Sequence, residues 1–264
     1  MANRPIEFYG LIIDQDNHPV PEVKVTFQVR YMKPPLRTDV IGDSFDEVTM
    51  LSDANGRFTL HDAKGSVLTV KMLEKAGYEP SPKATNRSYR YWDNEDTRFK
   101  PDSEHSEVFH MWKKAGAEGL VRKGISASLN YDGTSSTFDL LTGAKSESGD
   151  IRATLLCDRQ QVVAKRRGYE WTLTLEVLNG GLIESSDEQM YRAPADGYQS
   201  RLTIHMPAES ADWTDQKTIS VYLQLRDGKQ YGRAEIKALI GADRNTTPFY
   251  LTSYVNPTGS RNLE

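Results

Sequence analysis

Residues that commonly bind metals are few in this sequence, and their spacing does not form a recognisable metal centre. The five histidines are His18, His61, His105, His110 and His205. His105 and His110 are five residues apart, so on a strand their side chains would point to opposite faces of the sheet. No two histidines have the tight His-x-His spacing of some non-haem iron sites. The sequence therefore predicts no iron centre, and it gives no reason to expect another cofactor.

A nucleophilic enzyme is also not indicated. Cys157, the single cysteine, would have to be a thiolate held beside a base in order to act as a nucleophile. It instead continues the alternation of Ile151, Ala153 and Leu155, which indicates a buried position on a strand. The serines show no Gly-x-Ser-x-Gly elbow. We therefore expect no catalytic residues and no enzymatic activity. An unrecognised hydrolase is the alternative that remains open.

Two short segments are rich in the oxygen ligands that calcium prefers. The first, Asp14-Gln15-Asp16-Asn17, is better explained as a turn, because Asp and Asn side chains accept hydrogen bonds from nearby backbone amides. The second consists of Asp93, Asn94, Glu95 and Asp96, which could hold calcium weakly. Neither segment has the spacing of a complete calcium loop, so we expect no metal site.

Aromatic residues form the most suggestive cluster in the sequence, at Tyr89, Tyr91 and Trp92. Flat rings beside charged groups can stack on a sugar or anchor a protein partner. The competing interpretation, which we favour, is that the rings only hold a long loop against the surface of a domain. Trp213 has the same two interpretations. These four residues are the candidate binding residues, and the candidate partners are a protein or a glycan.

The elements that must position these side chains are predicted to be strands. Residues 6–13 form an apolar run, and in residues 23–29 every second side chain is apolar, which is typical of a sheet with one buried face. Residues 36–46 read as a loop. Asp53-Ala54-Asn55-Gly56 predicts a hairpin turn, because Asn-Gly readily adopts positive φ values. Helical periodicity is absent from this region.

The rest of the chain is divided by a change in composition. Residues 81–117 contain prolines, many charges and the aromatic cluster, and we interpret them as a surface connection between a domain at 1–80 and a second domain at 118–264. The second domain also reads as strands, of which the clearest are the two arms of a hairpin around Asp227-Gly228. Several short strands separated by turns predict an antiparallel sandwich or an open barrel. The whole chain is thus predicted to be all-β.

The pattern of residues 10–78 resembles that of the carboxypeptidase regulatory-like domains, a branch of the prealbumin-like or transthyretin-like β-sandwiches. The matching positions are Gly10, Asp14, Pro19, Val20, Val23, Val25, Asp53, Gly56, Phe58 and Gly77-Tyr78. The sequence departs from the pattern at Asn17-His18, which replace Gly-x, and at Ser52, which replaces threonine. The resemblance implies a prealbumin-like sandwich at the N-terminus. It implies no activity, since function resides in sites rather than in folds.

The whole chain further resembles a bacterial group that joins such a module to a second β domain. The similarity lies in Phe109-His110-Met111-Trp112-Lys113-Lys114, Ala193-Pro194-Ala195-Asp196-Gly197-Tyr198-Gln199 and the segment from Asn256 to Glu264. Members of that group are usually exported, often as lipoproteins. The resemblance therefore implies a periplasmic, lipoprotein or secreted location.

Charge and hydropathy narrow the choice of partner. The formal charge is −4, from 33 basic and 37 acidic residues, and the one basic cluster, Lys165-Arg166-Arg167, reads as a solvated hairpin end. Nucleic-acid binding usually requires a basic patch or stripe, so we do not expect it. No stretch approaches the roughly 20 apolar residues of a transmembrane helix.

The N-terminus leaves the location of the protein open. Met1 to Pro5 do not read as a signal peptide, because no apolar core follows the charge. The protein is therefore either cytoplasmic or exported by a signal upstream of Met1. We expect a non-catalytic extracytoplasmic binding or structural module that acts in protein interaction or assembly. A glycan-binding accessory protein is the second hypothesis.

Overall fold

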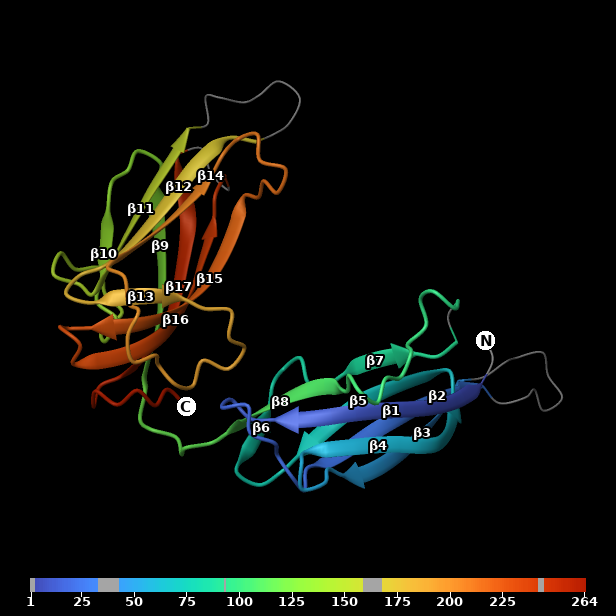
Figure 1. The fold of residues 1–264 in the computed structure, drawn as a ribbon. Helices are drawn as coiled ribbons and strands as arrows, with labels where there is room; N and C mark the ends of the chain where they lie inside the picture. The colour runs from blue at the N-terminus through green and yellow to red at the C-terminus, as the bar shows by residue number, and fades with distance from the viewer. Residues whose placement is uncertain (1–2, 33–42, 93, 159–167, 242–244) are drawn as a thin grey trace. The chain divides into compact units, whose positions relative to one another are not determined.

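The computed structural model describes residues 3–32, 43–92, 94–158, 168–241 and 245–264. In these residues the chain forms seventeen strands, so the expectation of an all-β protein is confirmed (Figure 1). No helix in the described part is long and apolar enough to cross a lipid bilayer. The chain divides into two compact units, Met1–Lys114 and Ala115–Glu264, called the N-terminal unit and the C-terminal unit below.

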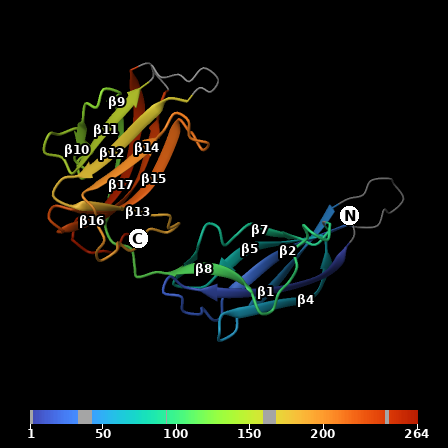
Figure 2. The ribbon, with the colours of Figure 1, turned by 45° about the horizontal axis from the view of Figure 1, so that its top comes forward.

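The N-terminal unit consists of two four-stranded sheets. One sheet has the order β4-β1-β8-β6 and the other the order β3-β2-β5-β7. The strands span β1 Arg4–Ile13, β2 Lys24–Met32, β3 Asp43–Leu51, β4 Arg57–Gly65, β5 Val67–Glu74, β6 Tyr78–Pro80, β7 Arg87–Arg90 and β8 Glu107–Lys113. All neighbours are antiparallel except β1 and β8, which run parallel. Figure 2 shows β1, β4 and β8 as one layer and β2, β5 and β7 as the other.

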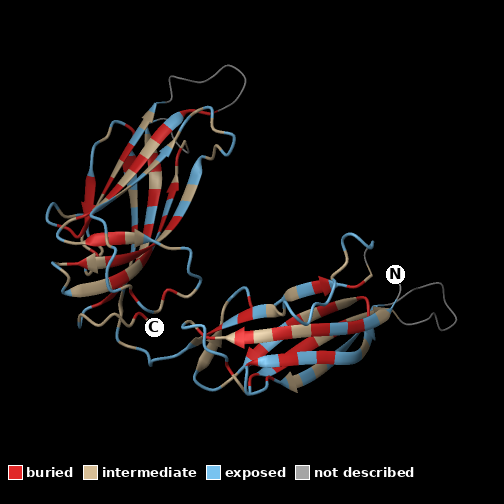
Figure 3. Cartoon of the chain, viewed as in Figure 1, coloured by how far each residue is buried: buried red, intermediate tan, exposed pale blue. Residues whose placement is uncertain are grey.

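The core of the N-terminal unit is aromatic and lies between the two sheets. Alternation along the strands buries one face of each sheet, as Figure 3 shows along β1 and β4. The ring of Phe8 lies within 6.2 Å of the rings of Phe27, Phe58 and Phe109, measured between centroids. Complete burial of a side chain of this size contributes about 1.5–3 kcal/mol. The alternation predicted for residues 23–29 is therefore correct, and it faces this core.

Gly10 makes room for one of these rings. It is paired with Phe58 across β1 and β4, and a Cβ atom placed on Gly10 would lie 2.0 Å from the Cζ of Phe58. Phe58 therefore covers the backbone of Gly10. A side chain at position 10 would have to displace a ring that other rings already confine.

The turn at Asp53–Gly56 is formed as expected, but the hairpin is not. The amide of Gly56 donates to the Asp53 carbonyl, and Gly56 has a φ of 71°. However, β3 pairs with β2 while β4 pairs with β1. The turn therefore carries the chain from one sheet to the other, because each flanking strand finds its partner in a different layer.

The predicted surface connection differs most from the structure. Within residues 81–117, β7 pairs with β5 and β8 lies between β1 and β6, so most of this segment belongs to the N-terminal unit. The predicted loop at residues 36–46 also ends earlier than expected, because β3 begins at Asp43. Residues 33–42, and the basic cluster at 165–167, lie outside the described residues. The connection at 81–117 and the loop at 36–46 differ from the structure for the same reason. In both, charged residues occupy the exposed face of a strand whose other face packs inward.

The C-terminal unit also consists of two sheets, with the orders β10-β11-β12-β14 and β13-β15-β16-β17-β9. Its strands are antiparallel and span β9 Val121–Asn130, β10 Ser136–Phe138, β11 Ile151–Asp158, β12 Glu170–Val177, β13 Gly181–Glu184, β14 Arg201–Met206, β15 Gln216–Leu225, β16 Gln230–Leu239 and β17 Thr246–Asn256. The expected hairpin is present as β15 and β16. The sequence pattern does not predict β13 or the long strand β17.

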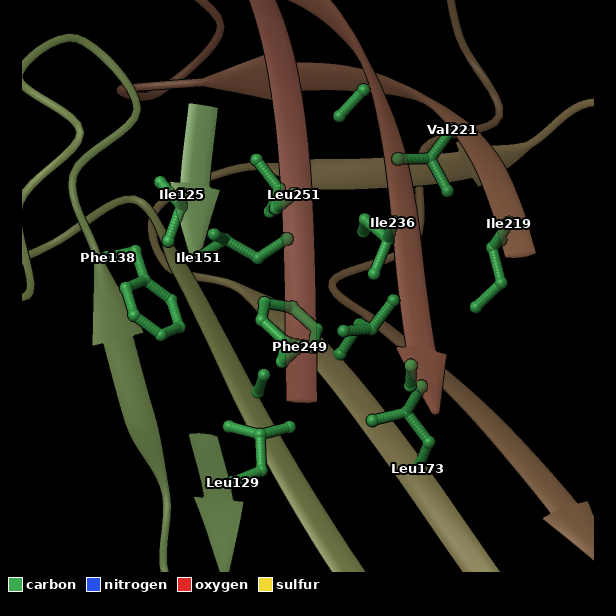
Figure 4. Close-up of a cluster of buried hydrophobic side chains, with 14 of the residues drawn as sticks. Ile125, Leu129, Phe138, Ile151, Leu173, Ile219, Val221, Ile236, Phe249 and Leu251 are labelled. Carbon is green, nitrogen blue, oxygen red and sulfur yellow. The ribbon is translucent and has the colours of Figure 1, made fainter. Parts of the chain in front are cut away.

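The two sheets of the C-terminal unit share one apolar core, shown in Figure 4. Phe138 of β10 stacks on Phe249 of β17, which belongs to the opposite sheet, with ring centroids 5.8 Å apart and an interplanar angle of 12°. Leu173 of β12 and Ile236 of β16 are fully buried in the same cluster. The core explains why alternating apolar residues are so regular in this half of the sequence.

The first and last residues of the C-terminal unit are held together by side chains. The carboxylate of Glu264 accepts hydrogen bonds from the amides of Ala115 and Gly116, at 2.7 and 2.9 Å. Asn256 and Ser260 donate to the carboxylate of Glu118. Hydrogen bonds to a carboxylate favour its charged form, and those from Asn256 and Ser260 lower the pKa of Glu118.

Candidate binding sites in the N-terminal unit

The histidines do not assemble a catalytic triad in the described part of the chain. His105 contacts the carboxylate of Asp102 at 2.9 Å, but both side chains are exposed, and the imidazole forms no hydrogen bond to a hydroxyl or thiol of the described residues. His205 contacts the hydroxyl of Thr172 at 3.0 Å, but without a carboxylate. Cys157 is only partly buried at the margin of the core, rather than fully buried as its parity suggests. Each of these sites has at most part of the machinery of a hydrolase.

The acidic segment at Asp14 is built as a turn. One carboxylate oxygen of Asp14 accepts hydrogen bonds from the amides of Asp16 and His18, both at 2.9 Å. Asp14, Asp16 and His18 are also the one group of acidic, histidine or cysteine side chains in the described residues close enough to share a cation. Because the Asp14 oxygen already serves two amides, the local structure is explained without an ion.

The second acidic segment is an exposed loop. Asp93 lies outside the described residues, and Asn94, Glu95 and Asp96 are exposed. The carbonyl of Asn94 accepts hydrogen bonds from the amides of Thr97 and Arg98, and the carboxylate of Glu95 pairs with Arg98 at 3.2 Å. The oxygens that suggested calcium are therefore partly engaged in closing the loop.

The aromatic cluster does not form the exposed platform that stacking on a sugar would require. Tyr89 and Tyr91 are only 7% and 5% exposed, and Trp92 is half-buried. The ring of Tyr89 packs edge-on against Phe8 and Phe99, with both centroid distances 4.7 Å. The two tyrosines therefore belong to the core. The alternation of Tyr89 and Tyr91 with the polar residues Ser88 and Arg90 is the signal in the sequence that indicates this burial.

The hydroxyl groups of the two buried tyrosines are both satisfied. Tyr89 donates to the carboxylate of Glu107, which also pairs with Arg87, and Tyr91 donates to the carbonyl of Glu7 at 2.6 Å. Burial raises the pKa of both phenols well above the ordinary value, so both remain neutral donors. They fasten β7 and the segment that follows it to β1 and β8.

Trp213 belongs to the C-terminal unit and is likewise anchored. Its indole nitrogen donates to the carbonyl of Tyr169 at 2.9 Å, and its ring packs edge-on against Tyr169, with centroids 5.0 Å apart. The side chain is partly buried against the core. The loop-anchoring interpretation therefore describes the position of Trp213 better than an exposed binding platform does.

A pocket lies along β1 where β8 does not reach. The pairing of β1 with β8 covers only Gly10 to Ile13 of β1. Beside the earlier part of β1, the chain leaves a pocket of about 270 Å³ lined by Arg4, Pro5, Glu7, Tyr91, Arg98, Phe99, Lys100 and Pro101. The amide of Phe99 donates to the Arg90 carbonyl at 2.8 Å, which closes the loop that forms the outer wall. None of the predicted candidates except Tyr91 lines this pocket.

The second notable surface is the edge strand β3. Three large apolar side chains are exposed on the outer face of its sheet: Phe45 at 55%, Leu51 at 63% and Met72 at 45%. Phe45 and Leu51 lie on β3, and Met72 lies on β5 opposite Thr26, which in turn pairs with Thr49. The three side chains therefore share one face of three neighbouring strands.

Comparison with known proteins does not add a function. No family model matches the chain, and comparison with curated proteins and with solved structures found no match. Because one fold can serve many functions, the function has to be argued from the sites themselves.

Proposed function

We propose that the chain is a non-catalytic binding protein that acts outside the cytoplasm and recognises a protein partner through the edge of β3. The observation that carries this proposal is the combination of a free edge with exposed apolar side chains at Phe45 and Leu51. An extended segment can add to such an edge, so that backbone hydrogen bonds give affinity and alternate side chains give specificity.

β3 is the edge strand of the N-terminal unit best suited to pairing. The edge strands β6 and β7 have only three and four residues. β4 is interrupted by a register shift opposite Ile6 and Phe8, where Asp62 has a φ of 64°. Shortness and bulges both protect an edge from further pairing. β3 has nine residues in unbroken register with β2, and therefore lacks both protections.

The direction of the free backbone groups follows from the turn after β3. The amide of Ser52 donates to the Val23 carbonyl, so the backbone amides and carbonyls of the even-numbered residues of β3 point toward β2. Because backbone groups alternate in direction along a strand, the amides of Phe45, Glu47 and Thr49 face the outer edge. The side chains of the same odd-numbered residues are exposed. A partner strand would thus meet free amides and exposed side chains at the same positions.

The charge of β3 indicates the chemistry of the partner. The strand contains Asp43, Asp46 and Glu47 and no basic residue. Glu47 forms no ion pair with any described residue, while Asp43 pairs with Arg30. A second copy of β3 would bring like charges together across the new pair, which is destabilising. The proposed partner is therefore an extended segment in which lysine or arginine alternates with apolar residues.

Labelled nine-residue peptides test this proposal directly. We expect a peptide of alternating lysine and valine to bind the full chain, measured by fluorescence anisotropy. A peptide with glutamate in place of lysine should bind at least tenfold more weakly. Methylation of the amides along one edge of the lysine peptide keeps charge and apolar surface but removes donors, so it should also abolish binding.

A matched pair of variants locates the binding on β3. Thr49→Pro removes one outward amide and leaves the hydrogen bonds to β2, whereas Thr49→Val keeps the amide and removes only the hydroxyl. Binding should be lost in the first and kept in the second. Equal binding by both variants, or by the methylated peptide, would refute recognition through this edge.

The extracytoplasmic location, and the assignment of the N-terminal unit to the carboxypeptidase regulatory-like domains, are also proposals. Export is supported by the resemblance of the whole chain, in residues 109–114, 193–199 and 256–264, to a bacterial group whose members are usually exported. The glycan hypothesis depended on exposed rings, and burial of Tyr89 and Tyr91 removes two of its four residues. No observation favours it or a hydrolase over protein recognition.

A further inference from the structure

The pocket beside β1 combines an apolar interior with a cationic rim. Its interior is provided by the rings of Phe99 and Tyr91 and by Pro5 and Pro101. Phe99 is held in place by contacts with Phe8, Tyr89 and Tyr91, so the wall it forms is fixed by the core. Pre-formed apolar pockets with a few convergent polar groups are the usual form of small-ligand sites.

Three cations surround this interior, namely Arg4, Arg98 and Lys100. Arg4 and Lys100 form no ion pair with any described residue. Arg98 pairs with Glu95, but the side chain of Glu95 is 80% exposed, and exposed ion pairs of this kind are weak. All three cations are therefore available to an anion that enters the pocket.

Glu7 is the single acidic residue of the lining. The formal charge around the pocket is thus three positive groups against one negative group. The lining therefore has a net positive charge and attracts an anion, while Glu7 repels it. The small volume and the apolar side chains favour a ligand that has a charged end and an apolar end.

We propose that this pocket binds a monocarboxylate that carries a small apolar or aromatic group. The carboxylate lies against the arginine and lysine side chains, and the apolar group packs on Phe99 and the two prolines. Arginine binds carboxylates well because its planar fork can donate two parallel hydrogen bonds. A volume of about 270 Å³ is slightly below the range of pockets for drug-sized ligands, so the bound group is about one side chain in size.

This chemistry has two natural sources, which are a free organic acid and the C-terminal residue of a peptide. N-acetyl-phenylalanine represents the peptide terminus, and 3-phenylpropionate represents the free acid. N-acetyl-phenylalaninamide is the neutral control with the same ring. We expect at least one of the two acids to bind the full chain in calorimetric titration. The neutral amide should bind at least tenfold more weakly. Binding of the acetylated amino acid alone would identify the peptide terminus.

Substitutions of lining residues test the location. Arg98→Gln and Lys100→Gln should each weaken the binding of the acids by about tenfold, since each removes a charged contact worth about 1.5 kcal/mol or more. Lys71→Gln removes an exposed lysine of β5 outside the pocket and is the matched control. It should leave binding unchanged.

Glu7→Gln provides an independent test, because it should strengthen the binding of the acids rather than weaken it. A variant that gains affinity cannot owe its effect to misfolding. Equal binding of acid and amide, or equal losses in Arg98→Gln and Lys71→Gln, would overturn the proposal. Failure of Glu7→Gln to improve binding would show that the acids do not bind beside β1.

Discussion

Replacing Gly10 by alanine should destabilise the N-terminal unit through one specific clash. The added Cβ atom would lie 2.0 Å from Cζ of Phe58 and 2.5 Å from each neighbouring ring carbon. Ordinary contact between carbon atoms requires about 3.5–4.0 Å, so the ring would have to retreat by roughly 1.5–2 Å. Phe58 is 4% exposed and its ring lies within 6.1 Å of those of Phe8, Phe27 and Phe109, which leaves little space for such a movement.

The size of the effect can be worked out from two opposing contributions. Overpacking a well-filled core costs about 1–3 kcal/mol, and the close distance at Gly10 favours the upper end. Alanine also restricts the conformations of the unfolded chain, which stabilises the folded state by about 0.4–1 kcal/mol. The net loss in free energy of unfolding is therefore about 2 kcal/mol. Since about 1.4 kcal/mol corresponds to a factor of ten, this equals roughly a 30-fold change in the unfolding equilibrium.

Hydrogen exchange followed by mass spectrometry on the full chain measures this change within one unit. The slowest amides of a unit exchange through its global opening, so their rates report the free energy of unfolding. We expect the protected amides of β1 and β4 to exchange roughly 30-fold faster in Gly10→Ala. Amides of β15 and β16, which belong to the other unit, serve as an internal reference.

Gly124 supplies the matched control, because it also lies in a strand and a Cβ atom there would meet nothing within 4 Å. Gly124→Ala should therefore cause no loss of protection in β9. A second control combines Gly10→Ala with Phe58→Leu, whose shorter side chain makes room for the methyl group. The two changes should together cost less than their sum. Unchanged exchange in Gly10→Ala, or strict additivity in the double variant, would refute the reasoning.

Three further changes test the fold. Val25→Asp places an unpaired carboxylate at a fully buried position, costs several kcal/mol and should unfold the N-terminal unit; a folded variant with unchanged thermal melting by circular dichroism would contradict the assigned core face. Gly56→Val forces a branched residue to a φ of 71° with its Cβ 2.4 Å from the Ile12 carbonyl. The free energy of unfolding measured with urea should therefore fall by about 2 kcal/mol or more. Hydrogen bonds lower the folded pKa of Glu118, so its stabilisation is complete above the ordinary glutamate pKa and is lost as pH falls through the lowered value. Amide protection of residues 256–264 should therefore decline below about pH 4 in the natural chain but not in Glu118→Gln.

Much of the fold could be predicted because alternation is a local property. The strand from residues 23–29 and the hairpin arms of β15 and β16 follow from the sequence, since one face of each packs on a core. The role of the Asp53–Gly56 turn could not be predicted in the same way. Its hydrogen bonds are local, whereas the choice between a hairpin and a crossing between sheets depends on which distant strand each arm pairs with.

Strand β17 shows a second limit of local patterns. Its buried face includes the polar residues Thr247 and Ser253, and Asn256 at its end is also buried. The strand contains Pro248, which normally argues against an interior strand. Pro248 is tolerated because the pairing of β17 with β16 reaches only as far as Phe249. The hydroxyl of Thr247 then donates to the carbonyl of Leu239 beyond the end of that pairing.

The candidate pocket was beyond prediction for a related reason. It joins Arg4 to Phe99, which are far apart in the sequence, and it exists because β8 begins only at Glu107. The aromatic cluster, in contrast, is visible in the sequence, and the favoured interpretation, that its rings hold this segment against the domain, agrees with the burial of Tyr89 and Tyr91. The charges at Arg87 and Arg90 suggested a solvated loop, while Tyr89 and Tyr91 between and after them face the core.

In both units the first strand pairs with the last, since β1 lies beside β8 and β9 lies beside β17. A ribosome delivers the chain from its N-terminus at roughly 5–20 residues per second. About 90 residues separate β1 from β8, and about 115 separate β9 from β17. Roughly 5 to 25 seconds therefore pass between the synthesis of β1 or β9 and the synthesis of the last strand that pairs with it. During synthesis these two edges stay unpaired longest, and we expect the nascent chain to be the state in which strands mispair most often.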